Sequence, residues 1–456
     1  MRRLLPLILI LALLAGCKPA DNSLDGVSPS PDAVVTPDTS PDASPKATPT
    51  PTPTPTPSPE PTPTPEPEPI TATLTVAGDV MSHLSVIYGA EKDENGEYDF
   101  HKMMEAAKPW VESADLAVAN LETTFSGGPD YSGFPAFNGP DSMGEALKDT
   151  GFDLLCTTNN HSLDRGYTGL CRTLDVLDEQ GLAHVGTYRT QEERDENHGI
   201  VVADCGGISI AFLAYSYGTN GKQVPEGKEW CINLFNSDYL STLSTPNMAL
   251  LESDMAAAQE LGCDLIAVIM HWGVEYQTTP NSYQKRMART MVDLGADLVL
   301  GGHPHVLQPY EFITTEAGNS GFVCYSLGNF ISNQDFDDTN STVLLNLELK
   351  KDLVTGETTV ESAGYIPFFM VNPGSNFLNK PVILLDTYAA IDSYQNGELD
   401  LTGGKSYRDL NVDKIHAQLQ NSLSVCQTIL GTAGDLQLEI TYEPDPATEK
   451  STSGTE

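Results

Sequence analysis

Residues 296–308, ADLVLGGHPHVLQ, run from an apolar strand into a turn that carries two histidines. The turn begins with Gly301 and Gly302, and His303 and His305 stand on either side of a proline. One histidine at a strand end is commonplace, whereas two imidazoles this close on a tight turn indicate a shared target. A metal ion is one such target, because histidine is the commonest metal ligand. The rest of the sequence has to supply the other ligands.

The same pattern, an apolar strand that ends in polar residues, recurs along the chain. We expect strands within 71–81, 114–123, 151–161, 182–187, 207–218, 263–273, 296–305, 322–329 and 341–351, the last antiparallel and half exposed. Helical spacing of apolar residues predicts helices over 100–114, 166–180, 248–262 and 282–295. Strands that alternate with helices predict an α/β fold with a substantially parallel sheet and helices packed outside it.

Ligand-type side chains gather at the ends of these predicted strands. They are Asp79, Asn120 with Glu122, Asn159 to His161, His271, and His303 with His305. In α/β proteins, binding sites form beyond the carboxyl ends of the strands. We therefore expect these side chains to meet at one site.

Each cluster taken alone also has a structural explanation. Asp79 is a common turn residue, His83 could cap a helix or lie on the surface, and His271 could be a core histidine packed by Trp272. Asp164 and Arg165 could form a surface ion pair. The paired histidines of the 301–308 turn favour the functional interpretation, because two imidazoles on one turn need a common partner.

Together the candidates combine hard oxygen ligands with imidazoles, which suits Mn²⁺, Fe²⁺ or Zn²⁺ better than Ca²⁺. The candidate ligands are Asp79, Glu122, Asn160, His271, His303, His305 and His83. They exceed what one tetrahedral ion needs, and they fit two ions that share a carboxylate, as in metal-assisted hydrolysis. The predicted cofactor is therefore one or two divalent metal ions.

Five blocks of sequence resemble the signature blocks of the CapA family, the capsule or poly-γ-glutamate synthesis proteins of the calcineurin-like metallophosphoesterase superfamily. They are GDVM (78–81), NLET (120–123), NNHSLDRG (159–166), HWGVEY (271–276) and GGHPHVLQ (301–308). The resemblance spans about residues 72–335. It implies a four-layer α/β/β/α sandwich of the metallophosphatase type, with two facing sheets flanked by helices.

The resemblance also implies roles for individual residues. Asp79, Glu122, Asn160, His271, His303 and His305 stand at the positions of metal ligands, with Glu122 in place of a bridging aspartate. His161 would lie beside the substrate as a general acid or oxyanion stabiliser, Asp164 would orient it, and Arg165 would contact a substrate anion.

Two departures from the superfamily pattern leave three alternatives: a site with two ions, a site with one ion, and a site that binds without turnover. Met81 stands where the superfamily has a histidine, so His83 is offset, and Glu122 replaces an aspartate.

The N-terminal part of the chain predicts membrane anchoring. Residues 1–17 form a basic and then apolar signal sequence whose end, LAGC, resembles a lipobox with Cys17 as the lipidated residue. The alternative is an ordinary cleaved signal peptide. Residues 18–70 form a Pro/Thr-rich extended linker. We therefore expect the protein on the extracellular face of the cell membrane, held by an N-terminal lipid anchor.

The folded part is expected to comprise a domain over 71–375 and a C-terminal extension over 376–440, followed by an acidic disordered tail over 441–456. The extension carries no chemical motif. Of the eight cysteines, none forms a CxxC pair, which argues against a structural zinc site.

The charge of the chain restricts its partners. The formal net charge is −39 at pH 7, which excludes nucleic acid as a partner. An anionic substrate would need locally bound cations.

The sequence is compatible with two functions and fits a third less well. The first is a surface-anchored, metal-dependent hydrolase or transferase that acts on a cell-envelope substrate in capsule or poly-γ-glutamate synthesis or export. The second is a non-catalytic accessory subunit of a membrane complex that synthesises capsule or poly-γ-glutamate. A solute-binding lipoprotein would explain the anchor but not the polar strand ends.

Overall fold

The computed structural model describes residues 67–372, 378, 380–399, 401 and 411–439. The predicted signal sequence with Cys17, most of the linker and the acidic tail lie outside these residues. The chain divides into Met1–Thr64 and Pro65–Glu456, and the description below concerns the second unit. Within its described part, no helix has the length and apolar character needed to cross a membrane.

The first large sheet has the strand order β16-β15-β14-β1-β4-β5-β6, with β13 paired to the end of β1. Its strands are β1 (Ile70–Val80), β4 (Leu116–Leu121), β5 (Leu154–Cys156), β6 (Ala183–Val185), β13 (Asn329–Ile331), β14 (Ser341–Lys351), β15 (Thr358–Val371) and β16 (Ile383–Asp386). β1, β4, β5 and β6 are parallel, and the strands from β14 to β16 are antiparallel. The carboxyl ends of the parallel strands therefore share one edge.

The second large sheet has the order β11-β12-β10-β9-β8-β7. Its strands are β7 (Val201–Cys205), β8 (Ile208–Ser216), β9 (Leu265–His271), β10 (Leu298–Gly302), β11 (Leu307–Thr314) and β12 (Ser320–Leu327). The four central strands are parallel, and β7 and β11 close the edges in antiparallel pairs. A short hairpin of β2 (Glu91–Lys92) and β3 (Tyr98–Asp99) stands apart.

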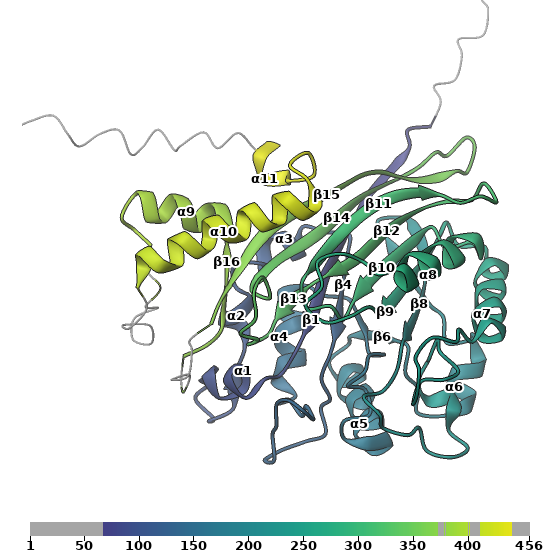
Figure 1. Cartoon of the computed structure of the whole chain (residues 1–456), viewed down its shortest axis with the longest axis horizontal. Helices are drawn as coiled ribbons and strands as arrows, with labels where there is room; N and C mark the ends of the chain where they lie inside the picture. The colour runs from purple at the N-terminus through teal and green to yellow at the C-terminus, as the bar shows by residue number, and fades with distance from the viewer. Residues whose placement is uncertain (1–66, 373–377, 379, 400, 402–410, 440–456) are drawn as a thin grey trace, which may run out of the picture. The chain divides into compact units, whose positions relative to one another are not determined.

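The helices of the described part are α1 (Leu84–Gly89), α2 (His101–Met104), α3 (Lys108–Glu112), α4 (Ser142–Thr150), α5 (Gly166–Glu179), α6 (Gln191–Glu196), the 3-10 helix η1 (Glu229–Cys231), α7 (Met248–Leu261), α8 (Ser282–Asp293), α9 (Thr387–Gln395), α10 (Val412–Leu430) and α11 (Leu436–Glu439). Helices α2 to α4 cover the outer face of the first sheet, and α7 and α8 cover that of the second, whereas α9 and α10 pack on the opposite face of β15 (Figure 1).

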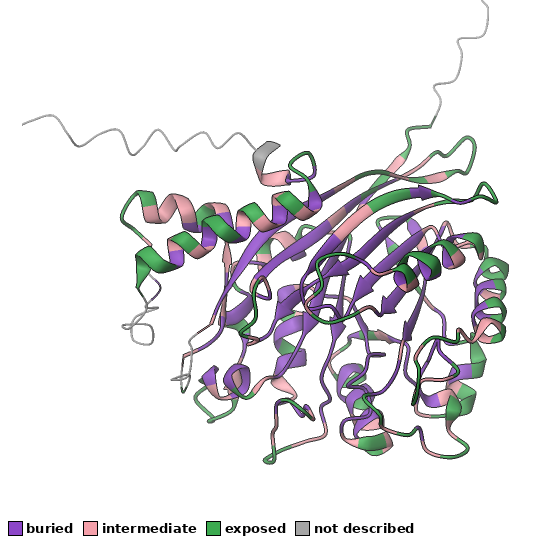
Figure 2. Cartoon of the chain, viewed as in Figure 1, coloured by how far each residue is buried: buried purple, intermediate pink, exposed green. Residues whose placement is uncertain are grey.

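Successive residues of a strand point to opposite faces of its sheet, which explains the layers. In β4, Leu116 and Val118 enter a core between the two sheets, whereas Ala117 and Ala119 face a core shared with α2, α3 and α4. In β9, alternate residues divide in the same way between the inter-sheet core and a core shared with α7 and α8. Figure 2 shows the buried strands inside partly exposed helices. The predicted four-layer α/β/β/α sandwich is confirmed.

Two predictions about local structure are wrong. Residues 100–114 form two short helices, α2 and α3, because Pro109 occupies the first turn of α3 and cannot donate the backbone hydrogen bond that one continuous helix needs. The strand over 341–351 is largely buried and not half exposed, because β14 lies between β1 and β15 and is covered on both faces.

The described residues within 376–440 contribute directly to the first sheet and its packing. β16 pairs with β15, and Ile415 and Leu419 of α10 pack with Phe369 of β15. Farther along α10, Cys426 joins the core between the sheets. The cysteines of the described part are free thiols and are mostly buried.

Candidate metal centre

The predicted ligands meet where the parallel strands of both sheets end. Asp79 lies at the end of β1 beside Asn120 of β4, and His271 at the end of β9 lies beside Gly302 of β10. Glu122 follows β4 directly. The site is thus built by the strand ends of two sheets that face each other, as the sequence pattern suggested.

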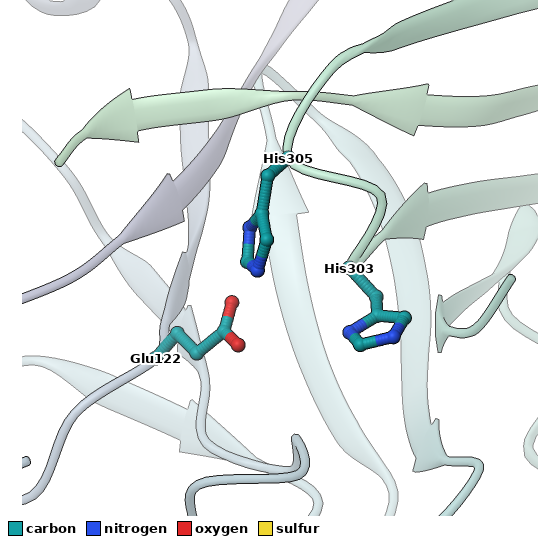
Figure 3. A group of neighbouring side chains, drawn as sticks. All are labelled: Glu122, His303 and His305. Atoms are coloured by element: carbon teal, nitrogen blue, oxygen red, sulfur yellow. The ribbon is translucent and has the colours of Figure 1, made fainter. Parts of the chain in front are cut away.

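Two sets of side chains could each hold a metal ion. Glu122, His303 and His305 form one set, and Figure 3 shows their polar ends pointing into one space. Asp79, Glu122 and His271 form the other. In each set the ligand atoms lie within 4.8 Å of one another, and every residue is buried. Because Glu122 belongs to both sets, the two sets would share it if each held an ion.

The environment of Glu122 shows whether these residues fit a cation. Glu122 is 0% exposed, and neither carboxylate oxygen has a hydrogen-bond partner among the residues that the structure describes. Its nearest ionisable neighbours are His271 Nε2 at 3.5 Å and His161 Nε2 at 3.9 Å from Oε1. Burial of a carboxylate that accepts no hydrogen bond is costly, and such groups are paired with positive charge or bind metals. His303 Nδ1 is likewise buried without a partner in the described part of the chain. The donor set therefore fits one or two divalent ions.

Unusual backbone geometry aims the two histidines of the 301–308 turn. His303 has φ 95° and His305 has φ 60°, and such left-handed conformations cost about 1–3 kcal/mol each for residues other than glycine. Neighbouring backbone bonds hold the turn, from Trp272 N to Gly302 O at 3.1 Å and from Tyr276 N to Pro304 O at 2.8 Å. Both imidazoles are thus directed into the site by a backbone conformation that is locally strained.

The two glycines before these histidines are required by close contacts. A Cβ at Gly301 would lie 2.0 Å from the carbonyl oxygen of Tyr325, and one at Gly302 would lie 2.9 Å from Asp79 Oδ1. A side chain at Gly301 would therefore overlap the backbone of the neighbouring strand, and one at Gly302 would displace the Asp79 carboxylate.

Asp79 is ionised and firmly held. Burial alone would raise the pKa of Asp79, but the hydrogen bond and positive charge of His305, the charge of His271 and the amide of Asn120 outweigh burial and lower this pKa. Asn120 Nδ2 donates to Asp79 Oδ1 at 2.7 Å, and His305 Nδ1 lies 3.1 Å from Asp79 Oδ2. Since Nδ1 of His305 also lies 3.1 Å from Asn329 Oδ1, it carries the proton and leaves Nε2 to face Glu122.

The histidines differ in charge because their neighbours differ. Burial lowers the pKa of His305, yet Glu122 and Asp79 more than compensate and raise it to about 9. Burial, together with His271 and His305, holds the pKa of His303 well below its ordinary value. Glu122 and Asp79 thus favour a second proton, on Nε2 of His305, which a divalent cation would displace on binding, and His303 offers a neutral imidazole.

Asn160 and His161 lie at the edge of the ligand sets. His271 Nε2 lies 2.9 Å from Asn160 Oδ1 and 3.5 Å from Glu122 Oε1, so the amide oxygen of Asn160 faces the centre. His161 Nδ1 lies 2.7 Å from Asp164 Oδ2, and Phe137 N donates to the same oxygen at 2.6 Å. Because Asp164 accepts, His161 carries its proton on Nδ1 and presents Nε2 to the site, 3.9 Å from Glu122 Oε1.

The two remaining candidates lie outside the ligand sets. His83 Nδ1 accepts a hydrogen bond from Asn333 N at 3.3 Å, and burial with the charges of His305 and His161 lowers the pKa of His83 to about 3. Arg165 donates from Nη2 to the carbonyl of Asp130 at 2.9 Å.

A cleft of about 710 Å³ opens on the side of the centre where His83 lies. Its walls come from the residues after β1, the residues after β13, β15 and α10, and include Phe134, Asn333 and Lys414. Part of the region 376–440, which carries no motif, therefore borders the space next to the centre.

Residues 217–222 also reach the site, and the sequence reasoning missed them. Asn220 lies within hydrogen-bond distance of Asn160 and His161, and Lys222 Nζ donates to the carbonyl of Asp164 at 3.2 Å. The ring centroids of Tyr217 and His303 are 4.6 Å apart. The one signal in the sequence is the Asn220–Gly221 pair, which indicates a tight turn but not where it lies.

Three comparisons place the chain among known proteins. It is 31% identical over 212 residues to the PGA biosynthesis protein CapA of Bacillus subtilis (strain 168), covering 46% of this chain and 50% of that protein. It is 26% identical over 291 residues to the capsule biosynthesis protein CapA of Bacillus anthracis, covering 61% and 64%. The chain therefore spans less than two thirds of the length of these relatives.

Solved structures show a weaker overall similarity. The NAD nucleotidase NadN of Haemophilus influenzae matches with a TM-score of 0.42 at 11% identity, covering 78% of this chain and 68% of that one. The calcineurin-like phosphoesterase YfkN of Bacillus subtilis matches with a TM-score of 0.36 at 11% identity, covering 78% and 99%.

The family model described as bacterial capsule synthesis protein PGA_cap matches residues 73–334, more than half of the chain. The match contains every residue of both ligand sets and the His161–Asp164 pair. It confirms the resemblance seen in the five sequence blocks. The chain belongs to the PGA_cap family of bacterial capsule synthesis proteins.

Proposed function

We propose that this protein is a divalent-metal-dependent hydrolase or transferase that acts on an anionic cell-envelope substrate in capsule or poly-γ-glutamate synthesis. One observation carries the proposal: Glu122 is buried, lacks a hydrogen-bond partner in the described structure and belongs to both ligand sets. A carboxylate in this position serves the fold poorly unless cations neutralise it.

Six residues would hold one or two ions: Asp79, Glu122, Asn160, His271, His303 and His305. Their mixture of oxygen and imidazole ligands suits Mn²⁺, Fe²⁺ or Zn²⁺. When bound, the ions would supply Lewis acidity and positive charge to a substrate that a chain of net charge −39 otherwise repels.

His161 is the residue of this chain that is placed to move a proton. Asp164 fixes the tautomer of His161 through Nδ1. The ring of Phe137 packs edge-on against the imidazole of His161, with 4.6 Å between the ring centroids. Nε2 is thereby held toward the centre, where it can accept or donate a proton at a reacting oxygen. Both His161 and Asp164 are buried, which limits competition from water.

A non-catalytic accessory role is the second candidate, and the names of relatives favour it. The chain is 26% identical over 219 residues, 44% of its length and 55% of the other, to the "probable polyglutamine synthesis accessory protein" of Mycobacterium tuberculosis (strain CDC 1551 / Oshkosh). In that role the protein would bind a membrane synthesis complex, and the centre would serve the fold or a partner.

Turnover by the metal-loaded full chain separates these candidates. We would assay bis(p-nitrophenyl) phosphate and a γ-glutamyl p-nitroanilide with Mn²⁺, comparing wild type, His161→Ala and Asp164→Asn. The catalytic proposal predicts that both variants keep their metal and that His161→Ala loses at least about 100-fold in kcat. Metal-loaded wild type that turns over neither substrate supports the accessory role. Turnover equal to wild type in His161→Ala would contradict the role given to His161.

We also propose that lipidation of Cys17 holds the protein on the extracellular face of the cell membrane. The support is the sequence alone, an apolar segment that ends in LAGC followed by a proline-rich linker. Cys17→Ser should move the protein from the membrane fraction to the medium or the soluble fraction. Unchanged membrane association of this variant would contradict the anchor.

A further inference from the structure

We propose that Asn220 is a positioning residue that sets the orientation of both Asn160 and His161, so that one exposed side chain supports metal binding and proton transfer together. The inference rests on the proposed function for its catalytic half. Its metal-binding half stands on the ligand sets alone.

The turn that carries Asn220 is built for this placement. Asn220 has φ 51° and Gly221 has φ 75°, and Lys222 N donates to Thr219 O at 2.9 Å. Positive φ at both central residues is the requirement of a type I′ turn, for which Asn-Gly is a preferred pair. Thr219 is buried, so the turn is fixed at its base while Asn220 lies at the exposed rim.

Both ends of the Asn220 amide are used, and each end constrains a neighbour. Asn160 Nδ2 donates to Asn220 Oδ1 at 3.2 Å, which leaves Asn160 Oδ1 facing His271 and the centre. If Asn160 were flipped, its NH₂ group would face the ions, and an NH₂ group cannot be a ligand. Asn220 therefore selects the orientation of Asn160 that can bind metal.

The other end of the amide meets the imidazole. Asn220 Nδ2 lies 3.3 Å from His161 Nε2. In the neutral tautomer that donates through Nδ1 to Asp164, Nε2 accepts, and Asn220 Nδ2 is the donor that fits it. The two roles of Asn220 agree with each other, because Oδ1 and Nδ2 cannot be exchanged without breaking both bonds.

Lys222 ties the same turn to the His161–Asp164 pair. Its Nζ donates to the carbonyl of Asp164 at 3.2 Å and lies 3.8 Å from Asp164 Oδ1. That carboxylate oxygen has no hydrogen-bond partner in the described residues. Lys222 thus links the turn that carries Asn220 to the His161–Asp164 pair.

The experiment uses the full chain with Asn220→Gly and Asn220→Asp. Glycine tolerates positive φ, so Asn220→Gly deletes the side chain without straining the turn. Asn220→Asp keeps an acceptor for Asn160 but offers no donor to His161. The matched control is Asn95→Gly, a second exposed Asn-Gly pair, in the β2–β3 hairpin, whose Asn bonds only to Asp93 in the contacts described.

The readouts are the Kd for Mn²⁺ by titration calorimetry, and kcat and KM for bis(p-nitrophenyl) phosphate. We expect Asn220→Gly to weaken Mn²⁺ binding about 10–100-fold, the usual loss when a partner of a metal ligand is removed, and to lower kcat. Asn220→Asp should keep most of the Mn²⁺ affinity but lower kcat with little change in KM. Asn95→Gly should match wild type in both readouts.

Wild-type Mn²⁺ affinity in Asn220→Gly would overturn the inference, and so would equal losses in Asn95→Gly. The Mn²⁺ measurement needs no substrate. An inactive wild type that binds Mn²⁺ would therefore remove the catalytic proposal, while the affinities of the variants still decide whether Asn220 orients Asn160.

Discussion

Gly302→Ala should damage the centre while leaving the fold intact. The added Cβ would lie 2.9 Å from Asp79 Oδ1, whereas His271 Nδ1 at 3.7 Å and Asn120 Nδ2 at 3.9 Å are in ordinary contact. Gly302 is not among the residues with positive φ, so alanine adds no backbone strain. The substitution therefore acts almost entirely on one metal ligand.

The size of the effect follows from that contact. Relief of the overlap requires the Asp79 carboxylate to move by about 0.5 Å, since unstrained contacts begin near 3.4 Å. Metal–ligand distances vary by only about 0.2 Å around their preferred values. Asp79 cannot move away freely, because Asn120 and His305 hold it. We expect at least about 100-fold weaker binding at the Asp79–Glu122–His271 set and little change at the other set.

The assay is Mn²⁺ titration calorimetry on the full chain, with circular dichroism to verify the fold. Gly301→Ala is the contrasting variant, because its Cβ would lie 2.0 Å from a backbone carbonyl and should destabilise the protein as a whole. If Gly302→Ala binds Mn²⁺ with wild-type stoichiometry and affinity, then Asp79 is not a ligand and the reasoning is refuted.

Two further predictions concern stability. Asp254→Ala should lower the free energy of unfolding by about 3–5 kcal/mol in urea titrations, because it leaves Arg194 buried without the ion pair that now joins Nη2 to Oδ2 at 2.6 Å; a loss below about 1 kcal/mol would contradict this. EDTA should lower the Tm of the Mn²⁺-loaded wild type, since an ion at 100 times its Kd adds about 2.7 kcal/mol. EDTA should leave the Tm of Glu122→Gln unchanged, and an equal shift in both proteins would show that the ion binds elsewhere.

The parts of the site that were predictable lie at the ends of strands buried on both faces. An uninterrupted apolar run such as that of β9 ends at His271, and the change from apolar to polar residues is visible in one sequence. The same reasoning located Asp79, Glu122 and the paired histidines. Their proximity followed from the rule that the carboxyl ends of parallel strands share an edge.

What the sequence did not reveal depends on contacts between distant segments. Asn220 lies in an Asn-Gly pair that is typical of any tight turn, and its bonds to Asn160 and His161 span about sixty residues. β16 and α10 carry no motif, and their place beside the first sheet depends on packing against β15. Helix spacing over 100–114 was misleading because apolar periodicity outweighed the single Pro109.

The central claim is that Glu122 would serve both ligand sets when metal is bound, and metal content tests it most directly. The full chain would be reconstituted with Mn²⁺, dialysed and analysed by mass spectrometry, with Glu122→Gln, His271→Ala and His305→Ala alongside. Membership of the ligand sets predicts about two equivalents in wild type, about one in each histidine variant and close to none in Glu122→Gln. Glu122→Gln that retains the wild-type metal content, or a folded wild type that binds no metal, would contradict the claim.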